Sequence, residues 1–244
     1  ANQAAYYVSG TCNSTGVSVV VTLTAGSATA AAEAADCTDS AWTTSVDASA
    51  LADGSISISA VGSTSLETST ATASVNKDTT GPSVSVPADI SVAATDANGT
   101  SSSDAAISAF LLGATASDAT DGNVSVTNDA PDMFPIGSTT VTFTAVDSLG
   151  NVGSNSATVT VEDQTAPVVT APAATTVAAT DANGTTKTDT SVAAFLDAAT
   201  ATDNVDANLT ITNNAPDVFP LGPTTVTFST TDSSGLTGSA TAVL

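Results

Sequence analysis

The most regular feature of the chain is an alternation of apolar and hydroxyl side chains. Val141, Phe143 and Ala145 alternate with threonines, and residues 17–23 and 157–161 follow the same period of two. This period gives a strand with one apolar and one polar face. No long segment shows the apolar stripe of an amphipathic helix, although residues 105–112 have helical propensity. The chain is therefore predicted to be all-β.

The chain from Asp78 onward is a tandem repeat. An offset of 85 residues aligns two copies without a gap, so that residues 78–82 fall on residues 163–167 and the segment 94–100 recurs unchanged at 179–185. A gapless period of this length indicates tandem domains rather than a solenoid of shorter units. Three domains are predicted: 1–77, 78–162 and 163–244.

The two repeats resemble the HYR (hyalin repeat) family. The resemblance is carried by the segment FPIGSTTVTFTAVDSLGN at residues 134–151 and by the opening DTTGPSVSVPADISVAATDANGT. The second copy keeps nearly all of it, with Leu236 in place of Asn151. This resemblance implies an Ig-like β-sandwich used in extracellular adhesion.

Residues 1–77 resemble the bacterial Ig-like domains that occur in tandem in large surface adhesins. The matching segments are AWTTSVDASALADGSISISA at residues 41–60 and NKDTTGP at residues 76–82. Trp42 is expected to anchor the core, with ligand stacking as the alternative, and the alanine-rich segment 28–35 could form a helical turn. Together the resemblances predict three tandem Ig-like β-sandwich domains forming an elongated rod.

The charge of the chain restricts its partners. There are 24 acidic residues and two basic ones, Lys77 and Lys187, with no arginine or histidine, which gives a net charge of −22. Nucleic-acid binding is excluded because nothing can neutralise phosphates, and binding to an anionic membrane is disfavoured. No run of 18 apolar residues exists, so no membrane insertion is expected. Self-repulsion of this size calls for bound divalent cations, high salt or both.

The only two cysteines, Cys12 and Cys37, are predicted to form a disulfide, with two buried free thiols as the alternative. An even cysteine count in a strand-rich, lysine-poor chain is typical of an oxidising compartment. The start Ala-Asn-Gln would suit a mature chain after removal of a signal peptide. An extracellular or cell-surface location is therefore expected.

Acidic turns are the strongest candidate site. In an Ig-like sandwich, the start of the first strand and two of the loops gather at one end, and in each copy these positions hold four aspartates. They are Asp78, Asp118, Asp121 and Asp147 in the first copy, and Asp163, Asp203, Asp206 and Asp232 in the second. Converging carboxylates would raise one another's pKa values. A hard cation with six to eight oxygen ligands would remove that repulsion, and calcium suits flexible loops better than magnesium.

Calcium at the two domain junctions is therefore predicted. The alternative is that the aspartates are solvated turn residues on a salt-adapted surface. The replacement of Asn151 by Leu236 makes the second site the poorer candidate. Asp96, in the tight turn of residues 95–100, is a further candidate for a role at the junction.

Catalysis is not expected. The chain has no histidine, no arginine and no thiol paired with a base, and carboxylates duplicated with the scaffold point to a duplicated structural feature. The leading prediction is a non-catalytic extracellular adhesive protein, either a subunit of a surface fibre or an adhesin stalk rigidified by calcium. The alternatives are a glycan- or protein-binding module and an accessory fragment of a secreted hydrolase.

The partners expected from the sequence are further copies of the chain in a fibre or array, or a cell-surface or matrix molecule. Residues 1–9 carry Tyr6 and Tyr7 and no charged side chain, which would suit pairing with a neighbouring subunit. Assembly should require salt or calcium to screen the negative charge. The alternative is that the chain is a fragment of a longer adhesin.

Overall fold

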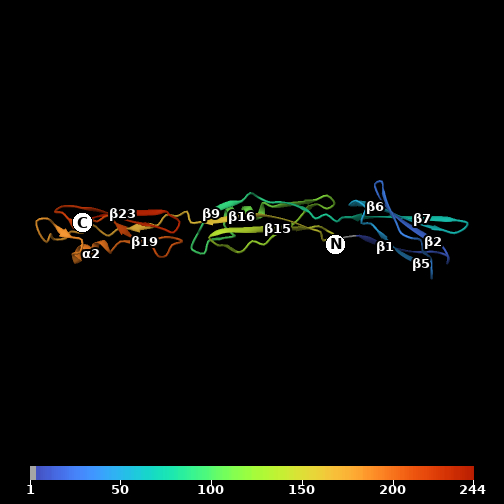
Figure 1. Cartoon of the computed structure of the whole chain (residues 1–244), viewed down its shortest axis with the longest axis horizontal. Helices are drawn as coiled ribbons and strands as arrows, with labels where there is room; N and C mark the ends of the chain where they lie inside the picture. The colour runs from blue at the N-terminus through green and yellow to red at the C-terminus, as the bar shows by residue number, and fades with distance from the viewer. Residues whose placement is uncertain (1–3) are drawn as a thin grey trace. The chain divides into compact units, whose positions relative to one another are not determined.

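The computed structural model describes residues 4–244 and is built almost entirely of strands (Figure 1). Strands make up 50% of the chain and helices 6%, which confirms the all-β prediction. None of the helices in the described part is long and apolar enough to cross a membrane. The chain forms two compact units: one contains residues 1–86, 114–128 and 142–156, and the other contains residues 87–113, 129–141 and 157–244.

The N-terminal part of the first unit is made of two antiparallel sheets around an aliphatic core. One sheet has the order β3-β2-β6-β7, with β4 also pairing with β2, and the other pairs β1 with β5. The bounds are β1 (Ala5–Thr11), β2 (Ser18–Ala25), β3 (Ala28–Ala31), β4 (Ala35–Asp36), β5 (Ala41–Asp47), β6 (Gly54–Ser63) and β7 (Thr68–Lys77). The alternation of residues 17–23 buries Val19, Val21 and Leu23 against Val46 and Ile56.

Three details of this part bear on open questions from the sequence. Residues Ala28–Ala31 form strand β3 rather than a helical turn, because their backbone pairs with β2. Trp42 packs against the core and covers Gly10, where an added Cβ atom would lie 2.7 Å from the indole ring. Cys12 and Cys37 are joined by a disulfide, as predicted.

The first repeat contains two larger sheets and the two-stranded sheet of β10 (Thr100–Ser101) and β14 (Met133–Phe134). A three-stranded sheet has the order β12-β11-β8, and a four-stranded sheet has the order β13-β15-β16-β9. In the second of these sheets β9 runs parallel to β16. The bounds are β8 (Ser83–Ser85), β9 (Ile90–Ala93), β11 (Thr115–Asp118), β12 (Gly122–Val124), β13 (Val126–Asn128), β15 (Gly137–Val146) and β16 (Val152–Glu162). The alternating apolar side chains Val141, Phe143 and Ala145 are buried, as their period requires.

Each repeat contains one short helix between its strands. Helix α1 (Ala105–Leu112) begins after Asp104, and α2 (Thr190–Leu196) begins after Asp189; both aspartates cap the helix by accepting backbone N–H groups. The remaining strands are β17 (Val168–Thr170), β18 (Thr185–Thr186), β19 (Thr200–Thr202), β20 (Thr212–Asn213), β21 (Val218–Phe219), β22 (Thr225–Thr231) and β23 (Thr237–Val243). The helical propensity of residues 105–112 is therefore realised.

The core of the second repeat is built around Phe228 of β22. Its side chain is fully buried, and its ring meets Phe195 of α2 edge-to-face with the centroids 5.9 Å apart. Val192 and Val226 complete the packing between helix and sheet. With so few aromatic residues in the chain, each buried ring contributes a large share of the apolar area of its domain.

Replacing Phe228 by Ala should lower the free energy of unfolding of the second repeat by about 3–5 kcal/mol, because it leaves a cavity in a rigid core. Urea unfolding followed by circular dichroism measures this loss. The exposed Leu221 is the matched control, and its replacement by Ala should change the free energy by less than about 0.5 kcal/mol. The unfolding transition seen by fluorescence of Trp42, which lies in the other unit, should not move.

Candidate functional site

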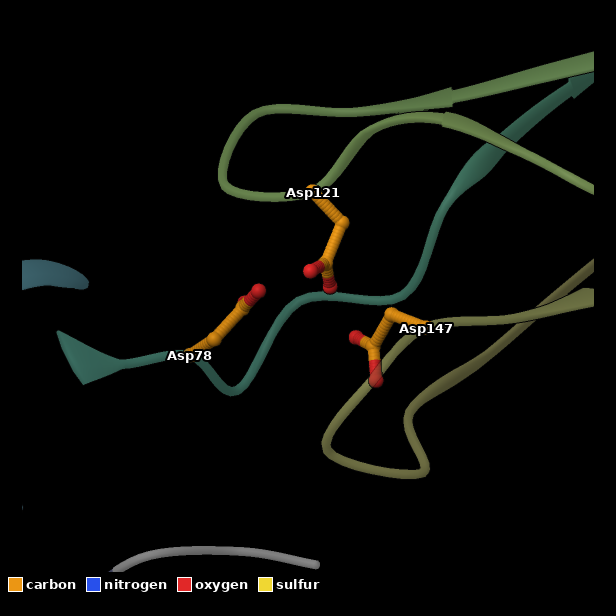
Figure 2. Close-up of side chains that lie close together, drawn as sticks. All are labelled: Asp78, Asp121 and Asp147. Atoms are coloured by element: carbon orange, nitrogen blue, oxygen red, sulfur yellow. The ribbon is translucent and has the colours of Figure 1, made fainter.

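Each repeat brings three aspartates together at its beginning. In the first, carboxylate oxygens of Asp78, Asp121 and Asp147 lie within 4.8 Å of one another. Figure 2 shows the three side chains converging from separate segments of the chain. Asp78 follows β7, Asp121 lies in the turn between β11 and β12, and Asp147 follows β15. This group is called the first triad.

The second triad consists of Asp163, Asp206 and Asp232, which occupy the matching positions 85 residues further on. Their carboxylate oxygens also lie within 4.8 Å of one another. Asp163 follows β16, Asp206 lies between β19 and β20, and Asp232 follows β22. The same three places in the fold therefore supply both triads.

The first triad is held by hydrogen bonds that cross between loops. Asp147 Oδ1 accepts the backbone N–H groups of Leu149 (2.9 Å) and Asn151 (2.8 Å), which closes the turn after β15. The side-chain amide of Asn151 donates to Asp147 Oδ2 (2.7 Å) and to the carbonyl oxygen of Asp78 (3.1 Å). Asn151 thus ties the segment entering the repeat to the turn after β15.

Asp121 is fixed from the same turn. Its Oδ2 accepts the backbone N–H (3.1 Å) and the hydroxyl (3.0 Å) of Ser148. In the second triad Asp206 Oδ2 accepts the hydroxyl of Ser233 at 2.9 Å. Each triad therefore has one carboxylate whose orientation depends on a serine 27 residues away in the chain.

A buried lysine positions the segment that enters the first repeat. Lys77 is 5% exposed, and its ammonium group donates to the carbonyl of Leu51 and lies 3.9 Å from Asp53 Oδ1. Asp53 in turn accepts hydrogen bonds from Thr79 and Thr80. Burial by itself would raise the pKa of Asp53, but these hydrogen bonds and Lys77 outweigh it and hold the pKa below its ordinary value. The residues on both sides of Asp78 are thereby anchored to the loop before β6.

Two glycines permit a close backbone contact beside the triads. A Cβ atom on Gly153 would lie 1.7 Å from the carbonyl oxygen of Pro82, and one on Gly238 would lie 1.8 Å from that of Pro167. Any side chain at these positions would push away the segment that begins at Asp78 or Asp163. The glycines therefore keep the first aspartate of each triad in place.

The other predicted aspartates have different roles. Asp118 and Asp203 lie outside the two triads, and each accepts backbone N–H groups through Oδ1 to close the turn that carries Asp121 or Asp206. Asp96 Oδ1 accepts the N–H of Asn98 and also lies in neither triad. A short side chain that can accept from the following backbone is the usual choice for such a turn.

Both triads contain buried oxygen atoms without a hydrogen-bond partner among the described residues, and these atoms are candidate metal ligands. Asp78, Asp163 and Asp232 are 2%, 9% and 8% exposed. The Oδ2 atom of each has no hydrogen-bond donor in the described part of the chain. A buried carboxylate oxygen without a partner is costly. Three carboxylates at this spacing form an all-oxygen donor set that fits a hard divalent cation.

The model of the HYR domain matches residues 77–161 and 162–243, which together make up more than half of the chain. The chain belongs to the HYR domain family. Each match begins one residue before the first aspartate of a triad, so both triads lie inside the HYR domains.

Two curated relatives are sea urchin proteins named hyalin. Hyalin of Strongylocentrotus purpuratus is 42% identical over 123 residues, and hyalin of Lytechinus variegatus is 36% identical over 176 residues. The matches cover 48% and 70% of this chain, but only 10% and 32% of the two relatives. The chain thus spans a small part of the length of these proteins.

Solved structures with some likeness include a 1.5-MDa bacterial ice-binding adhesin, which is 16% identical with a TM-score of 0.38, and protocadherin γB7 EC3–6, which is 17% identical with a TM-score of 0.34. The first alignment covers 99% of this chain and 90% of the adhesin chain; the second covers 93% and 68%. The HYR matches do not extend over residues 1–76, and the bacterial Ig-like assignment of residues 1–77 stays a prediction.

The pKa of Asp147 differs from the expectation that converging carboxylates raise one another's pKa. Burial by itself would raise the pKa of Asp147. The hydrogen bonds from the side chain and backbone of Asn151, and from the backbone of Leu149 and Gly150, outweigh burial and lower the pKa below its ordinary value of 3.8. Donors supplied by the turn thus favour the ionised carboxylate.

This shift predicts a pH dependence of stability. Because the folded-state pKa is depressed, the contribution of Asp147 is present at pH above the unfolded-state pKa and is lost as the pH falls through the folded-state value. Replacing Asn151 by Leu, the residue of the second copy, should raise the pKa of Asp147 and reduce the loss of stability on acidification. Urea unfolding in calcium-free buffer between neutral and acid pH measures the difference.

The control for this experiment is replacement of Asn155 by Leu. The Asn155 amide donates to the carbonyl of Val84 and to no carboxylate. This variant should be destabilised to the same extent at every pH. If Asn151→Leu behaves like Asn155→Leu, Asn151 does not set the pKa of Asp147.

Proposed function

We propose that this chain is a non-catalytic, extracellular structural protein of the adhesion type, whose HYR domains bind calcium at the two triads. The observation that carries the proposal is the aspartate triad, which is repeated with the domain and has buried carboxylate oxygen atoms without a donor in the described residues. The domain limits 1–77, 78–162 and 163–244 belong to the same proposal.

The membership of the HYR family supports an adhesive role, because the family resemblance implies extracellular adhesion. The disulfide between Cys12 and Cys37 supports an oxidising location. Within residues 4–244, Tyr7 is the one aromatic side chain that is largely exposed. A glycan-binding module would offer several exposed aromatics, so a structural role is favoured over recognition by aromatic stacking.

Calcium is favoured over magnesium by the form of the site. The ligands come from three loops that are not constrained to octahedral geometry, and calcium accepts such irregular oxygen sets. Asp78 and Asp163 stand where the chain enters each HYR domain, between β7 and β8 and between β16 and β17. A cation held by them would tie the entering segment to two loops of the domain and so stiffen the entry to each domain.

Calcium should therefore stabilise the chain beyond the effect of ionic strength. At a concentration of about 100 times Kd, it should raise the free energy of unfolding by about 2.7 kcal/mol for each site. A chelator should lower the melting temperature measured by circular dichroism at fixed ionic strength. The double variant Asp121→Ala, Asp206→Ala should lose this response.

The matched control is Asp96→Ala, Asp181→Ala, which removes the same two charges from tight turns outside the triads and should keep the response. If the chelator leaves the melting temperature of the unaltered chain unchanged, the aspartates are solvated turn residues and calcium is not part of the function.

We also propose self-association into a fibre or array through strand β1. Residues 1–3 of the predicted contact segment lie outside the described part of the chain. Residues Ala5–Thr11 pair with β5 on one edge, and no other described strand pairs with β1. Tyr6 packs against the core, whereas Tyr7 is 86% exposed. An uncharged edge strand with an exposed tyrosine suits pairing with another chain.

Sizing of the purified chain with and without calcium tests this part. Assembly should appear when calcium or salt screens the charge, and Tyr7→Ser should abolish it. The control Leu66→Ser removes an equally exposed apolar side chain in the turn between β6 and β7 and should have no effect. A strict monomer under all conditions would show that the chain is not a fibre subunit by itself.

A further inference from the structure

We infer that the two cation sites are not equivalent: the site in the second HYR domain binds calcium more tightly and uses the side-chain carbonyl of Asn204 as an additional ligand. This inference rests on the proposed calcium binding. It reverses the order expected from the sequence, where Leu236 in place of Asn151 made the second site the poorer candidate. Three differences between the copies support it.

The first difference is the role of Asn151. Its Nδ2 atom lies 2.7 Å from Asp147 Oδ2 and 3.1 Å from the carbonyl oxygen of Asp78. Both neighbours are acceptors, so the amide must present its nitrogen to them, and its carbonyl oxygen faces away from them. Asn151 therefore acts as an internal donor that occupies Asp147 Oδ2. A cation bound to that oxygen would have to displace it.

The second copy has no such donor. Leu236 contributes only its backbone N–H, which donates to Asp232 Oδ1 at 2.8 Å. Asp232 Oδ2 is buried and has no donor among the described residues. The corresponding oxygen of the second triad is thus available to a cation without loss of an existing hydrogen bond.

The second difference is Asn204, which corresponds to Ala119 in the first copy. Asn204 lies in the turn of residues 203–206 that delivers Asp206 to the triad. Its Nδ2 atom donates to the carbonyl oxygen of Ala94 at 2.9 Å, which fixes the orientation of the amide because a carbonyl cannot donate. The Oδ1 atom is then left buried with no partner in the described chain.

The third difference is burial. Asp206 is half-buried, whereas Asp121 is exposed. In the same turn Asp203 Oδ2 is also buried without a described partner, whereas Asp118 Oδ2 is not among the buried unpartnered atoms of the first copy. Four of the five such oxygen atoms in the described chain lie in the second triad or in the turn of residues 203–206 that carries Asp206: Asp163 Oδ2, Asp203 Oδ2, Asn204 Oδ1 and Asp232 Oδ2. The binding free energy of a cation is most favourable where more of its oxygen ligands are already desolvated, because water then screens the attraction less.

The geometry also links the second site to the first HYR domain. Ala94, which accepts from Asn204, follows β9, and its N–H donates to the carbonyl of Glu162, the residue before Asp163. A ligand to the cation is thereby hydrogen-bonded to a residue of the preceding copy. The first site has no counterpart of this contact, because Ala119 has no polar side chain.

Calorimetric titration of the whole chain with calcium chloride tests the inference, with one site disabled at a time. Asp206→Ala leaves the first site to be measured, and Asp121→Ala leaves the second. The second site should bind about tenfold more tightly, because one charge-assisted hydrogen bond must be broken only at the first. Unfolding transitions measured without calcium show whether each variant is folded.

Exchanging the residues that differ should exchange the affinities. Asn151→Leu should tighten the first site, and Leu236→Asn should weaken the second. Asn204→Ala, which copies Ala119, should weaken the second site about tenfold and leave the first unchanged. Asn204→Asp keeps an oxygen at the ligand position but loses the donor to Ala94. It should therefore lower stability in the absence of calcium but retain calcium binding. If Asn204 had a purely structural role, calcium binding would be lost as well.

The outcomes separate this inference from the proposed function. If the unaltered chain binds no calcium, the proposed function fails and the inference falls with it. If both sites bind with equal affinity, or the first binds more tightly, calcium binding stands and the inference is overturned. If Asn204→Asp loses binding as Asn204→Ala does, Asn204 is not a ligand.

Discussion

The structure depends on how the repulsion between converging aspartate carboxylates is offset in each HYR domain. Each HYR domain gathers three carboxylates within 4.8 Å, in a chain that carries a net charge of −22 and only two lysines. The ion-pair partners of those lysines are Asp53 and Asp217, which belong to neither triad. The described chain therefore offers no side-chain cation to neutralise the triads. Turn N–H groups, serine hydroxyls and one asparagine amide donate hydrogen bonds to some of the carboxylate oxygens. An external cation would neutralise the charge that remains.

The duplication of the domain shows which parts of the site are fixed by the fold. Both copies have an aspartate at the entry, a second in the loop fixed by a serine, and a third that closes the turn after the strand containing the core phenylalanine. These positions also share glycines that allow the backbone to approach within a distance that no side chain would permit. What varies is the group that fills the remaining space: Asn151 or Leu236, and Ala119 or Asn204. The scaffold determines where the carboxylates converge. These few residues determine how many of the carboxylate oxygens already accept a hydrogen bond.

The sandwiches themselves are built from unusually small side chains. Threonine and serine cover the outward faces of the strands, and valine is the commonest buried residue. The few phenylalanines and the capped helices α1 and α2 therefore supply much of the apolar volume. Thin cores of this kind are less stable than larger ones. Lys77, whose aliphatic stem is buried and whose ammonium group binds the Leu51 carbonyl, adds a polar anchor where the apolar contacts are few.

Features governed by local chemistry could be predicted from the sequence. The alternation of apolar and hydroxyl residues is a direct consequence of strand geometry, so the all-β fold and the inward positions of Val141, Phe143 and Ala145 follow from it. The 85-residue repeat and the pairing of Cys12 with Cys37 also needed no structure. The same sequence, however, placed Asp118 beside Asp121 as an equal candidate ligand, left the alanine-rich segment 28–35 open, and did not suggest a role for Lys77 or Asn204.

Those points were decided only by the tertiary structure, because they depend on donors and acceptors far away in the chain. Residues 28–31 are a strand because β2 lies beside them. Asp118 accepts the backbone N–H groups of Thr120 and Asp121 in its own turn, whereas Asp121 accepts the hydroxyl of Ser148, 27 residues away. The orientation of Asn151 is set by Asp78, 73 residues away, and that of Asn204 by Ala94, 110 residues away. The sequence determines which chemical groups are present and on which face of a strand they lie; the folded chain alone determines which oxygen atoms are satisfied and which remain for a cation.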